Sequence, residues 1–232
     1  MPAYIDIHSH SRKTTAALRI VNSDPQRFDR DVETLPYVSI GVHPWDTGTD
    51  FVDATLEWIA QNAAHPKVLA IGECGLDRRK GAELVRQEMI LERQIGVAEA
   101  LGKPMILHCV RAFDVLGRRL KFRKSPVAVI VHGFDQNPQI ARQLSRNGIY
   151  LSFGKALIRR ESNAAIVLRA YPPDLIFLET DDAEMSIEQV YRAAAEILRV
   201  EESWLVDRVH ENFTQVFGPT PPKNQAERDA LG

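Results

Sequence analysis

Side chains that bind divalent cations, imidazoles and carboxylates, recur at the ends of short apolar runs in this sequence. Asp6, His8 and His10 alternate near the N-terminus, where strand geometry predicts that they share one face. The same kinds of residue follow four more apolar runs: Glu73, His108, His132 and Asp181. Such donors suit divalent first-row metals, and one carboxylate can bridge two ions about 4 Å apart, as in two-metal hydrolases. The pattern predicts a metal-dependent enzyme.

The apolar runs that precede these residues are predicted β-strands, most of them separated by a segment of helix length. Seven strands are expected: Tyr4–Ile7, Tyr37–Val42, Val68–Ile71, Pro104–Leu107, Val127–Val131, Ile149–Ser152 and Leu175–Leu178. Helices are predicted at Val52–Ala63, Gly81–Leu101, Ala112–Leu120, Pro138–Asn147, Ile187–Leu198 and Glu202–Phe217. Strands alternating with helices favour a parallel, closed TIM-type (β/α) barrel over a short open sheet, although an eighth strand is not evident.

Barrel topology explains where the candidate ligands lie, because active sites of such barrels gather at the C-terminal ends of the strands. Each candidate occupies that end of its run, so residues remote in sequence are expected to converge. Taken one at a time, His108 and His132 could equally be structural histidines. Asp181, or more readily Asp182, could cap the helix that follows. Asp6 could either support the site from outside the ligand set or cap its own loop.

Length and composition favour one soluble domain. The chain has 232 residues, of which 44% are hydrophobic, and this predicts a single barrel over residues 1–218 with a Pro-rich tail at 219–232. The formal net charge of −2 excludes a strong global cationic field, although it does not exclude a nucleic-acid substrate. Cys74 and Cys109 have no CxxC spacing, which favours a reducing compartment. With no apolar stretch near ~20 residues and no signal-peptide pattern, we expect a cytoplasmic protein without a membrane partner, monomeric by default.

Several motifs, in this order along the chain, resemble those of a known family. They are Asp6-x-His8-x-His10, Gly41-Val42-His43-Pro44, Gly72-Glu73-x-Gly75-Leu76-Asp77, Gly102-Lys103-Pro104 before His108, His132-Gly133-Phe134 and Glu179-Thr180-Asp181. Together they resemble the TatD family of metal-dependent hydrolases and deoxyribonucleases, in the amidohydrolase-type barrel superfamily. The resemblance implies that His8, His10 and Asp181 hold one divalent ion. It further implies that His108 and His132 hold a second ion and that Glu73 bridges the two.

The resemblance also implies an activity, the hydrolysis of phosphodiester bonds in DNA by a metal-activated water. Two divalent ions are expected, with zinc, manganese and magnesium all compatible with the donors. Asp181 is the candidate to accept the proton of the water. His43 is expected to touch the substrate or orient a ligand, and Arg111 to meet a phosphate. The first loop and helix, at 11–36, are expected to be shorter than in the family's pattern, and the loop after Asp181 also departs from that pattern. These segments would line the mouth of the barrel.

Two other functions fit the same residues. One is a metal-dependent hydrolase of a small ester, lactone or amide, and the other is a catalytically silent barrel that acts as a binding protein. A phosphodiester substrate requires several cations at the mouth of the barrel, whereas a small acyl substrate requires a closed pocket with few polar anchors.

Overall fold

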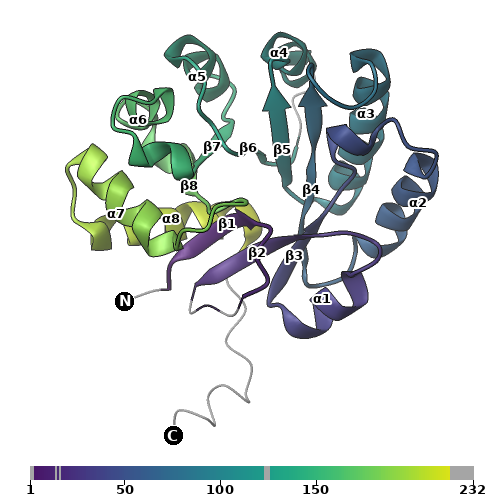
Figure 1. Ribbon diagram of the computed structural model, residues 1–232, viewed down its shortest axis with the longest axis horizontal. Coiled ribbons are helices and arrows are strands. Elements are labelled where there is room, and N and C mark those ends of the chain that lie inside the picture. The colour runs from purple at the N-terminus through teal and green to yellow at the C-terminus, as the bar shows by residue number, and fades with distance from the viewer. Residues whose placement is uncertain (1–2, 14, 16, 123–125, 220–232) are drawn as a thin grey trace, which may run out of the picture.

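Eight parallel strands follow one another around the sheet in chain order (Figure 1). The computed structural model describes residues 3–13, 15, 17–122 and 126–219. The strands are β1 (Ile5–Ser9), β2 (Leu18–Ser23), β3 (Tyr37–Ile40), β4 (Val68–Asp77), β5 (Met105–Val110), β6 (Val129–Val131), β7 (Tyr150–Phe153) and β8 (Ile176–Leu178). A parallel bridge between Ser9 and Asp181 returns the sheet to β1. The predicted TIM-type barrel is confirmed.

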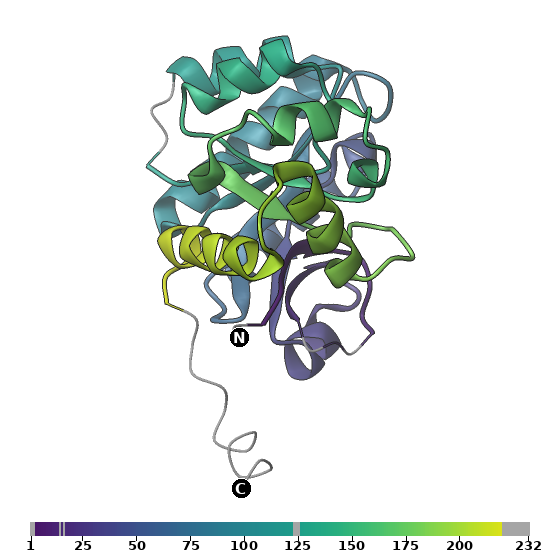
Figure 2. The same cartoon turned by 90° about the vertical axis from the view of Figure 1, so that its left-hand side faces the viewer.

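Helices surround the strands on the outside of the barrel (Figure 1). They are α1 (Phe28–Thr34), α2 (Val52–Asn62), α3 (Leu84–Leu101), α4 (Phe113–Phe122), α5 (Pro138–Ser145), α6 (Asn163–Leu168), α7 (Ile187–Leu198) and α8 (Glu202–Phe217), with short 3-10 turns η1 (Pro44–Asp46), η2 (Lys155–Ile158) and η3 (Pro173–Leu175). Helix α8, yellow in Figure 2, packs on β8 and β1 and so brings the last described helix beside the first strand. Among the described residues, no helix combines the length and the hydropathy that a bilayer crossing requires.

The eighth strand is β2, which sequence reasoning missed. It lies within the segment 11–36, which was interpreted as a shortened loop and helix, so the predicted second strand at Tyr37–Val42 is in fact the third. Ile20 and Val21 of β2 are buried. The Arg19 side chain donates a hydrogen bond to Asp6, and the Asn22 side chain accepts one from the Glu73 amide. Half of its six residues are polar, so β2 lacks the apolar run by which the other strands are recognised.

Local sequence signals fix the helix ends. Helix α3 ends at Gly102, whose φ of 63° is left-handed, and Leu91 and Ile95 of this helix are buried against the barrel. Helix α7 begins with a capping box in which Ser186 and Gln189 exchange hydrogen bonds. The alternative that Asp181 or Asp182 caps this helix is therefore wrong. The predicted tail lies outside the described residues from 220 onward, so the domain division at 218 stays a prediction.

The buried core fills the space between the strands and the helices, and both cysteines belong to it. Cys74 and Cys109 are free and buried. Burial raises the pKa of the Cys109 thiol to about 12 and also raises that of Cys74. Both thiols therefore stay protonated and unreactive near neutral pH.

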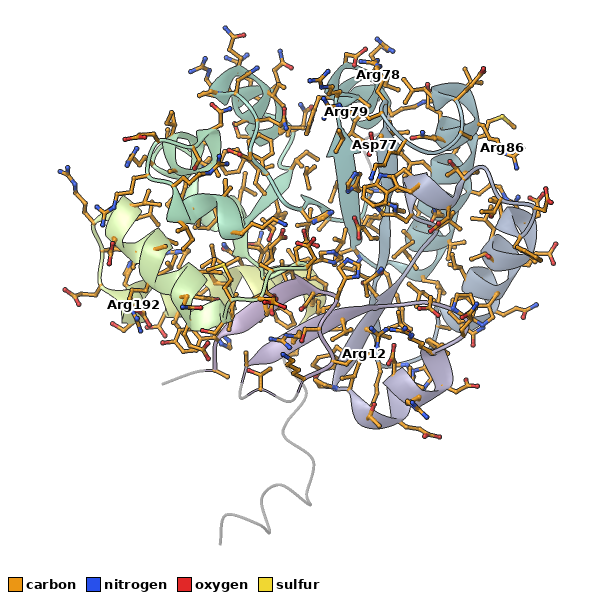
Figure 3. The ribbon with its side chains drawn as sticks, viewed as in Figure 1. Arg12, Asp77, Arg78, Arg79, Arg86 and Arg192 are labelled. Atoms are coloured by element: carbon orange, nitrogen blue, oxygen red, sulfur yellow. The ribbon has the colours of Figure 1, made fainter. Side chains whose placement is uncertain are left out.

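Asp31 of α1 fastens the loop after β1 to the rest of the barrel. Arg12 contacts it bidentately, with Nε 2.8 Å from Oδ1 and Nη2 2.7 Å from Oδ2, and the Ser23 hydroxyl donates to Oδ2 at 2.7 Å. Figure 3 shows Arg12 beside β2 and β3. Burial raises the pKa of Asp31, but the hydrogen bonds from Arg12 and Ser23 outweigh burial and leave the pKa below its ordinary value.

We predict that Asp31→Asn lowers the free energy of unfolding by about 1–3 kcal/mol at pH 7, because a buried charged acceptor is lost. A carboxylate whose folded pKa is depressed stabilises above its unfolded pKa, and loses this contribution as pH falls through the folded pKa. The deficit of the variant should therefore be constant above about pH 5 and shrink below the ordinary carboxyl pKa near 3.8. Urea unfolding at several pH values measures it, with exposed Asp29→Asn of the same helix as control. A deficit that does not change with pH would contradict the assignment.

Candidate metal centre

Glu73 lies at the middle of the cluster, and an irregularity of β4 places it there. Ile71 pairs with Met105 and Cys74 with Leu107, so that Gly72 and Glu73 together lie opposite the single residue Ile106. A bulge of this kind changes the direction in which a strand side chain points, here that of Glu73. The Asn22 side chain accepts a hydrogen bond from the Glu73 amide at 2.8 Å, and only 4% of Glu73 is exposed.

A glycine two residues later lets β4 pass close to β5. Gly75 has a φ of +137°, and a Cβ built on it would lie 2.0 Å from the His108 carbonyl oxygen. Any side chain there would push the two strands apart. Gly75 therefore sets the separation between Glu73 on one strand and His108 on the next.

The two carboxylate oxygens of Glu73 face two different sets of donors. On the first side, Oε2 lies 3.3 Å from Nε2 of His8 and 3.3 Å from Nε2 of His10. Asp181 Oδ1 lies 3.7 Å and 3.6 Å from the same two nitrogens. These three residues come from β1 and from the end of β8, the two strands that close the barrel.

The second set faces Oε1 of Glu73. Nε2 of His132 lies 2.8 Å from this oxygen and Nδ1 of His108 lies 3.0 Å from it. His43, which directly precedes η1, also approaches, with Nε2 at 3.1 Å. His43 was expected to touch the substrate or to orient a ligand, yet its imidazole lies almost as close to Glu73 as the other two imidazoles.

Two further carboxylates contact the outer nitrogens of the second pair of histidines. Asp77 Oδ2 lies 3.4 Å from Nε2 of His108, and Glu179 Oε1 lies 3.4 Å from Nδ1 of His132. Metal-binding histidines commonly hold such a carboxylate on their other nitrogen, which fixes the ring and raises its basicity. Asp77 was named only as part of a motif, and so was Glu179. Its place two residues before Asp181 was the available signal.

Asp6 supports the site without facing it. Its carboxylate accepts hydrogen bonds from the Thr180 amide at 2.9 Å, from the Thr180 hydroxyl at 2.8 Å and from Arg19 Nε at 2.8 Å. A register shift in β1 between Asp6 and Ser9 interrupts the simple alternation on which the shared face of Asp6, His8 and His10 was predicted. Asp6 thus ties β1 to the residue before Asp181, which decides between its two expected roles.

Burial and mutual attraction control the charges in this cluster. Burial raises the pKa of Glu73, but the neighbouring imidazoles, led by His132, hold this pKa well below its ordinary value. Burial lowers the pKa of His132, whereas Glu73 and Glu179 raise it well above the ordinary range. Burial also raises the pKa of Asp181, with Glu179 acting in the same direction. The buried carboxylates therefore require positive charge beside them, from protons or from a cation.

The donors fit a divalent metal ion. Both ring nitrogens of His8 are buried and have no hydrogen-bond partner, although Nε2 points at the carboxylates. Buried polar atoms seldom stay without a partner. Four overlapping groups have ligand atoms within 4.8 Å of one another: His8, His10 and Asp181; His8, Glu73 and His132; His43, Glu73 and His108; and His132, Glu179 and Asp181. Imidazole and carboxylate donors in these groups match the preference of zinc and related first-row ions.

Comparison with known proteins assigns this chain to a family. The family model described as TatD related DNase matches residues 7–218, which is most of the chain. This chain belongs to the TatD-related DNase family. The TatD resemblance expected from the motifs is thereby confirmed.

Individual TatD-family proteins are similar to this chain in sequence or in fold. The chain is 33% identical over 171 residues to the "Uncharacterized metal-dependent hydrolase YabD" of Bacillus subtilis, covering 70% of this chain and 66% of the relative. It is 34% identical over 146 residues to the "3'-5' ssDNA/RNA exonuclease TatD" of Musicola paradisiaca, covering 61% and 54%. The chain thus spans less than two thirds of the length of these relatives. The crystal structure of YjjV, a TatD homolog from Escherichia coli, has the same fold, with a TM-score of 0.82, 24% identity and coverage of 94% and 98%.

The structure brings together the six candidate ligands of the TatD pattern in this chain, and His43 with them, but not Arg111. Arg111 follows β5 with a left-handed φ of 51° and is exposed. Its carbonyl accepts a hydrogen bond from Arg78. Its expected contact with a phosphate stays a prediction.

We predict that Glu73→Gln abolishes most of the stabilisation that metal gives this protein. A ligand at a hundredfold excess over its Kd stabilises the folded state by about 2.7 kcal/mol per site. Melting with and without zinc or manganese measures this gain, and elemental analysis measures the bound metal. Asp182→Asn is the matched control, because this exposed neighbour of Asp181 pairs with Lys155 instead. Full metal stabilisation in Glu73→Gln would contradict a central role for this carboxylate.

A second prediction concerns the outer carboxylate of His132. We expect Glu179→Gln to weaken metal binding by roughly 10- to 100-fold, because the neutral amide no longer raises the basicity of the ring. Titration with a metal-sensitive dye compares the variant with Glu184→Gln, an exposed position before α7. Equal affinities in a folded Glu179→Gln protein would show that Glu179 only fills space.

Proposed function

We propose that this protein is a metal-dependent nuclease that cleaves phosphodiester bonds in single-stranded nucleic acid, in particular DNA. The observation that carries the proposal is the division of donors around Glu73, with one set at each carboxylate oxygen. Two-metal sites in phosphatases and nucleases use two neighbouring ions to stabilise both the attacking oxygen and the leaving oxygen of an in-line displacement. A shared carboxylate holds two ions at such a separation. Relatives named as exonucleases of single-stranded DNA and RNA support the choice of substrate.

In this proposal the donors form two ligand sets. His8, His10 and Asp181 hold the first ion, and His108 and His132 hold the second, with Glu73 shared between them. Zinc, manganese and magnesium are the candidate ions. When bound, they would supply a hydroxide from water near neutral pH and would polarise an oxygen of the phosphate whose phosphorus is attacked.

Asp181 is proposed to accept the proton from the attacking water. Its side chain is 25% exposed, whereas that of Glu73 is 5% exposed, so Asp181 is the carboxylate that water reaches more easily. Hydrogen bonds from the Asp181 amide to the His8 carbonyl and from the His10 amide to the Asp181 carbonyl fix the backbone that carries it.

Cationic side chains at the mouth favour a phosphodiester over a small acyl substrate. Arg78, Arg79 and Lys80 directly follow β4, and all three are exposed. Figure 3 shows Arg78 and Arg79 at the end of this strand, next to Asp77. Phosphate oxygens are the natural partners of such cations. Because a barrel mouth is smaller than the groove a long duplex requires, the proposed substrate is the exposed end of a single strand.

We predict that Asp181→Asn lowers kcat by roughly 10²- to 10⁴-fold with little change in KM, because it removes a proton acceptor rather than a substrate contact. Cleavage of an end-labelled single-stranded oligonucleotide by manganese-loaded protein measures both constants. Asp182→Asn again serves as control and should keep wild-type rates. A proportionate rise in KM with kcat unchanged would show that Asp181 acts in binding.

The substrate class is tested on the same loaded protein with single-stranded DNA, duplex DNA, RNA and simple acyl esters. We expect single-stranded DNA to be cleaved fastest and acyl esters to remain intact. Turnover of acyl esters without phosphodiester cleavage would replace the proposal by the small-ester hydrolase. Bound metal without turnover of any substrate would replace it by the binding protein.

A further inference from the structure

A large aromatic ring lies exposed directly beside the candidate metal centre. Trp45, in η1 two residues after His43, is 48% exposed. Its ring centroid lies 4.8 Å from that of His43 and 5.9 Å from that of His108. Tryptophan combines a large apolar ring with a polar N–H group, and for this reason it is enriched at binding surfaces.

A hydrogen bond to Asp77 fixes the orientation of the Trp45 ring. The indole Nε1 donates a hydrogen bond to Asp77 Oδ2 at 2.6 Å, and the same carboxylate oxygen lies 3.4 Å from His108 Nε2. Asp77 in turn accepts from the Arg79 amide at 2.8 Å. The ring is thereby held at one defined position next to the cluster, and about half of its surface remains exposed to solvent.

A cation already rests on one face of the ring. Lys80 Nζ lies 3.7 Å from the Trp45 ring centroid. Of the neighbouring cations, Arg78 is paired with Asp114 at 3.0 Å, whereas the described side chains place no carboxylate against the Arg79 guanidinium. The rim beside the metal centre thus combines an aromatic face with cations that are not neutralised.

We propose that Trp45 is a stacking platform for an unpaired nucleobase next to the bond to be cleaved, with Lys80 meeting the adjoining phosphate. The inference rests on the proposed nuclease function and specifies how its substrate is recognised. Stacking of a base on an aromatic ring changes affinity by roughly 5- to 140-fold, whereas an exposed cation–π contact contributes roughly 2- to 5-fold. A base therefore displaces the Lys80 ammonium from the ring, which frees the ammonium for the phosphate.

This recognition has a defined selectivity. Every base has a stacking face, so the platform tolerates any sequence. A base within a duplex is stacked on its own neighbours and must be unpaired first, which disfavours duplex substrates. The Trp45 platform therefore selects frayed or single-stranded ends by the accessibility of the base rather than by its identity.

The test measures equilibrium binding of a labelled octanucleotide to the metal-free protein in excess chelator, by fluorescence anisotropy. Three variants are compared with the wild type. Trp45→Leu removes the ring, Trp45→Phe keeps a ring but removes the bond to Asp77, and Trp204→Phe changes an exposed tryptophan on α8 as the control. We expect a loss of roughly 5- to 140-fold for Trp45→Leu, a smaller loss for Trp45→Phe and none for Trp204→Phe.

Oligonucleotides with one abasic position near the end supply the decisive comparison. At one such position, removal of the base should lower the affinity of the wild type by a factor similar to that caused by Trp45→Leu. The affinity of Trp45→Leu itself should not fall further at this position, because the missing base and the missing ring remove the same contact. Equal abasic effects in the wild type and in Trp45→Leu would overturn the proposal. So would equal losses in Trp45→Phe and Trp45→Leu, since Trp45 would then act only through Asp77.

Failure of this inference differs from failure of the proposed function. Metal-dependent cleavage of oligonucleotides with unchanged KM in Trp45→Leu would overturn the platform and leave the nuclease standing. Base-dependent binding at Trp45 without cleavage by loaded protein would support the platform and overturn the nuclease. Lys80→Met adds a separate check, because it should weaken octanucleotide binding and make that binding less sensitive to salt.

Discussion

The whole active end of this barrel depends on the burial of one carboxylate. Glu73 is almost fully enclosed, and an ionised carboxylate in such a place costs several kcal/mol unless positive charge compensates it. Five imidazoles have a nitrogen within 3.3 Å of its two oxygens. In the absence of a cation the imidazoles must supply protons, and with a cation they become neutral donors. The bulge in β4 and the glycine at 75 are the backbone features that allow this arrangement.

Closure of the barrel uses the same residues as the candidate site. The bridge between Ser9 and Asp181 joins the first and last strands, and Asp6 binds Thr180 beside it. An ion held between β1 and β8 would therefore also hold the barrel closed, which connects metal binding with folding. His8, Glu73 and His108 lie within strands, whose ladder hydrogen bonds fix their backbones. His10, His132 and Asp181 lie just beyond strand ends.

Sequence patterns predicted those parts of the molecule that depend on local or periodic signals. Strands with continuous apolar runs and the helices α7 and α8 lie where they were expected, and the donors converge as barrel topology requires. However, β4 and β5 continue past Glu73 and His108, which were expected to follow the ends of their strands. Strand β2 was missed because its polar residues, among them Arg19 and Asn22, serve Asp6 and Glu73 rather than solvent. The register shifts in β1 and β4 could not be inferred, because they depend on pairing with a neighbouring strand. The position of Trp45 beside His108 also could not be inferred from the sequence, because only folding brings these two residues together.

In the proposed site, Glu73 is shared between two ions held by separate sets of donors. Electron paramagnetic resonance during titration with manganese tests this sharing most directly, because two ions about 3.5–4 Å apart across a carboxylate are magnetically coupled. We predict that the hyperfine pattern of isolated ions is replaced by the spectrum of a coupled pair as the second equivalent binds. Saturation at one ion, or two ions that keep the isolated pattern, would contradict it.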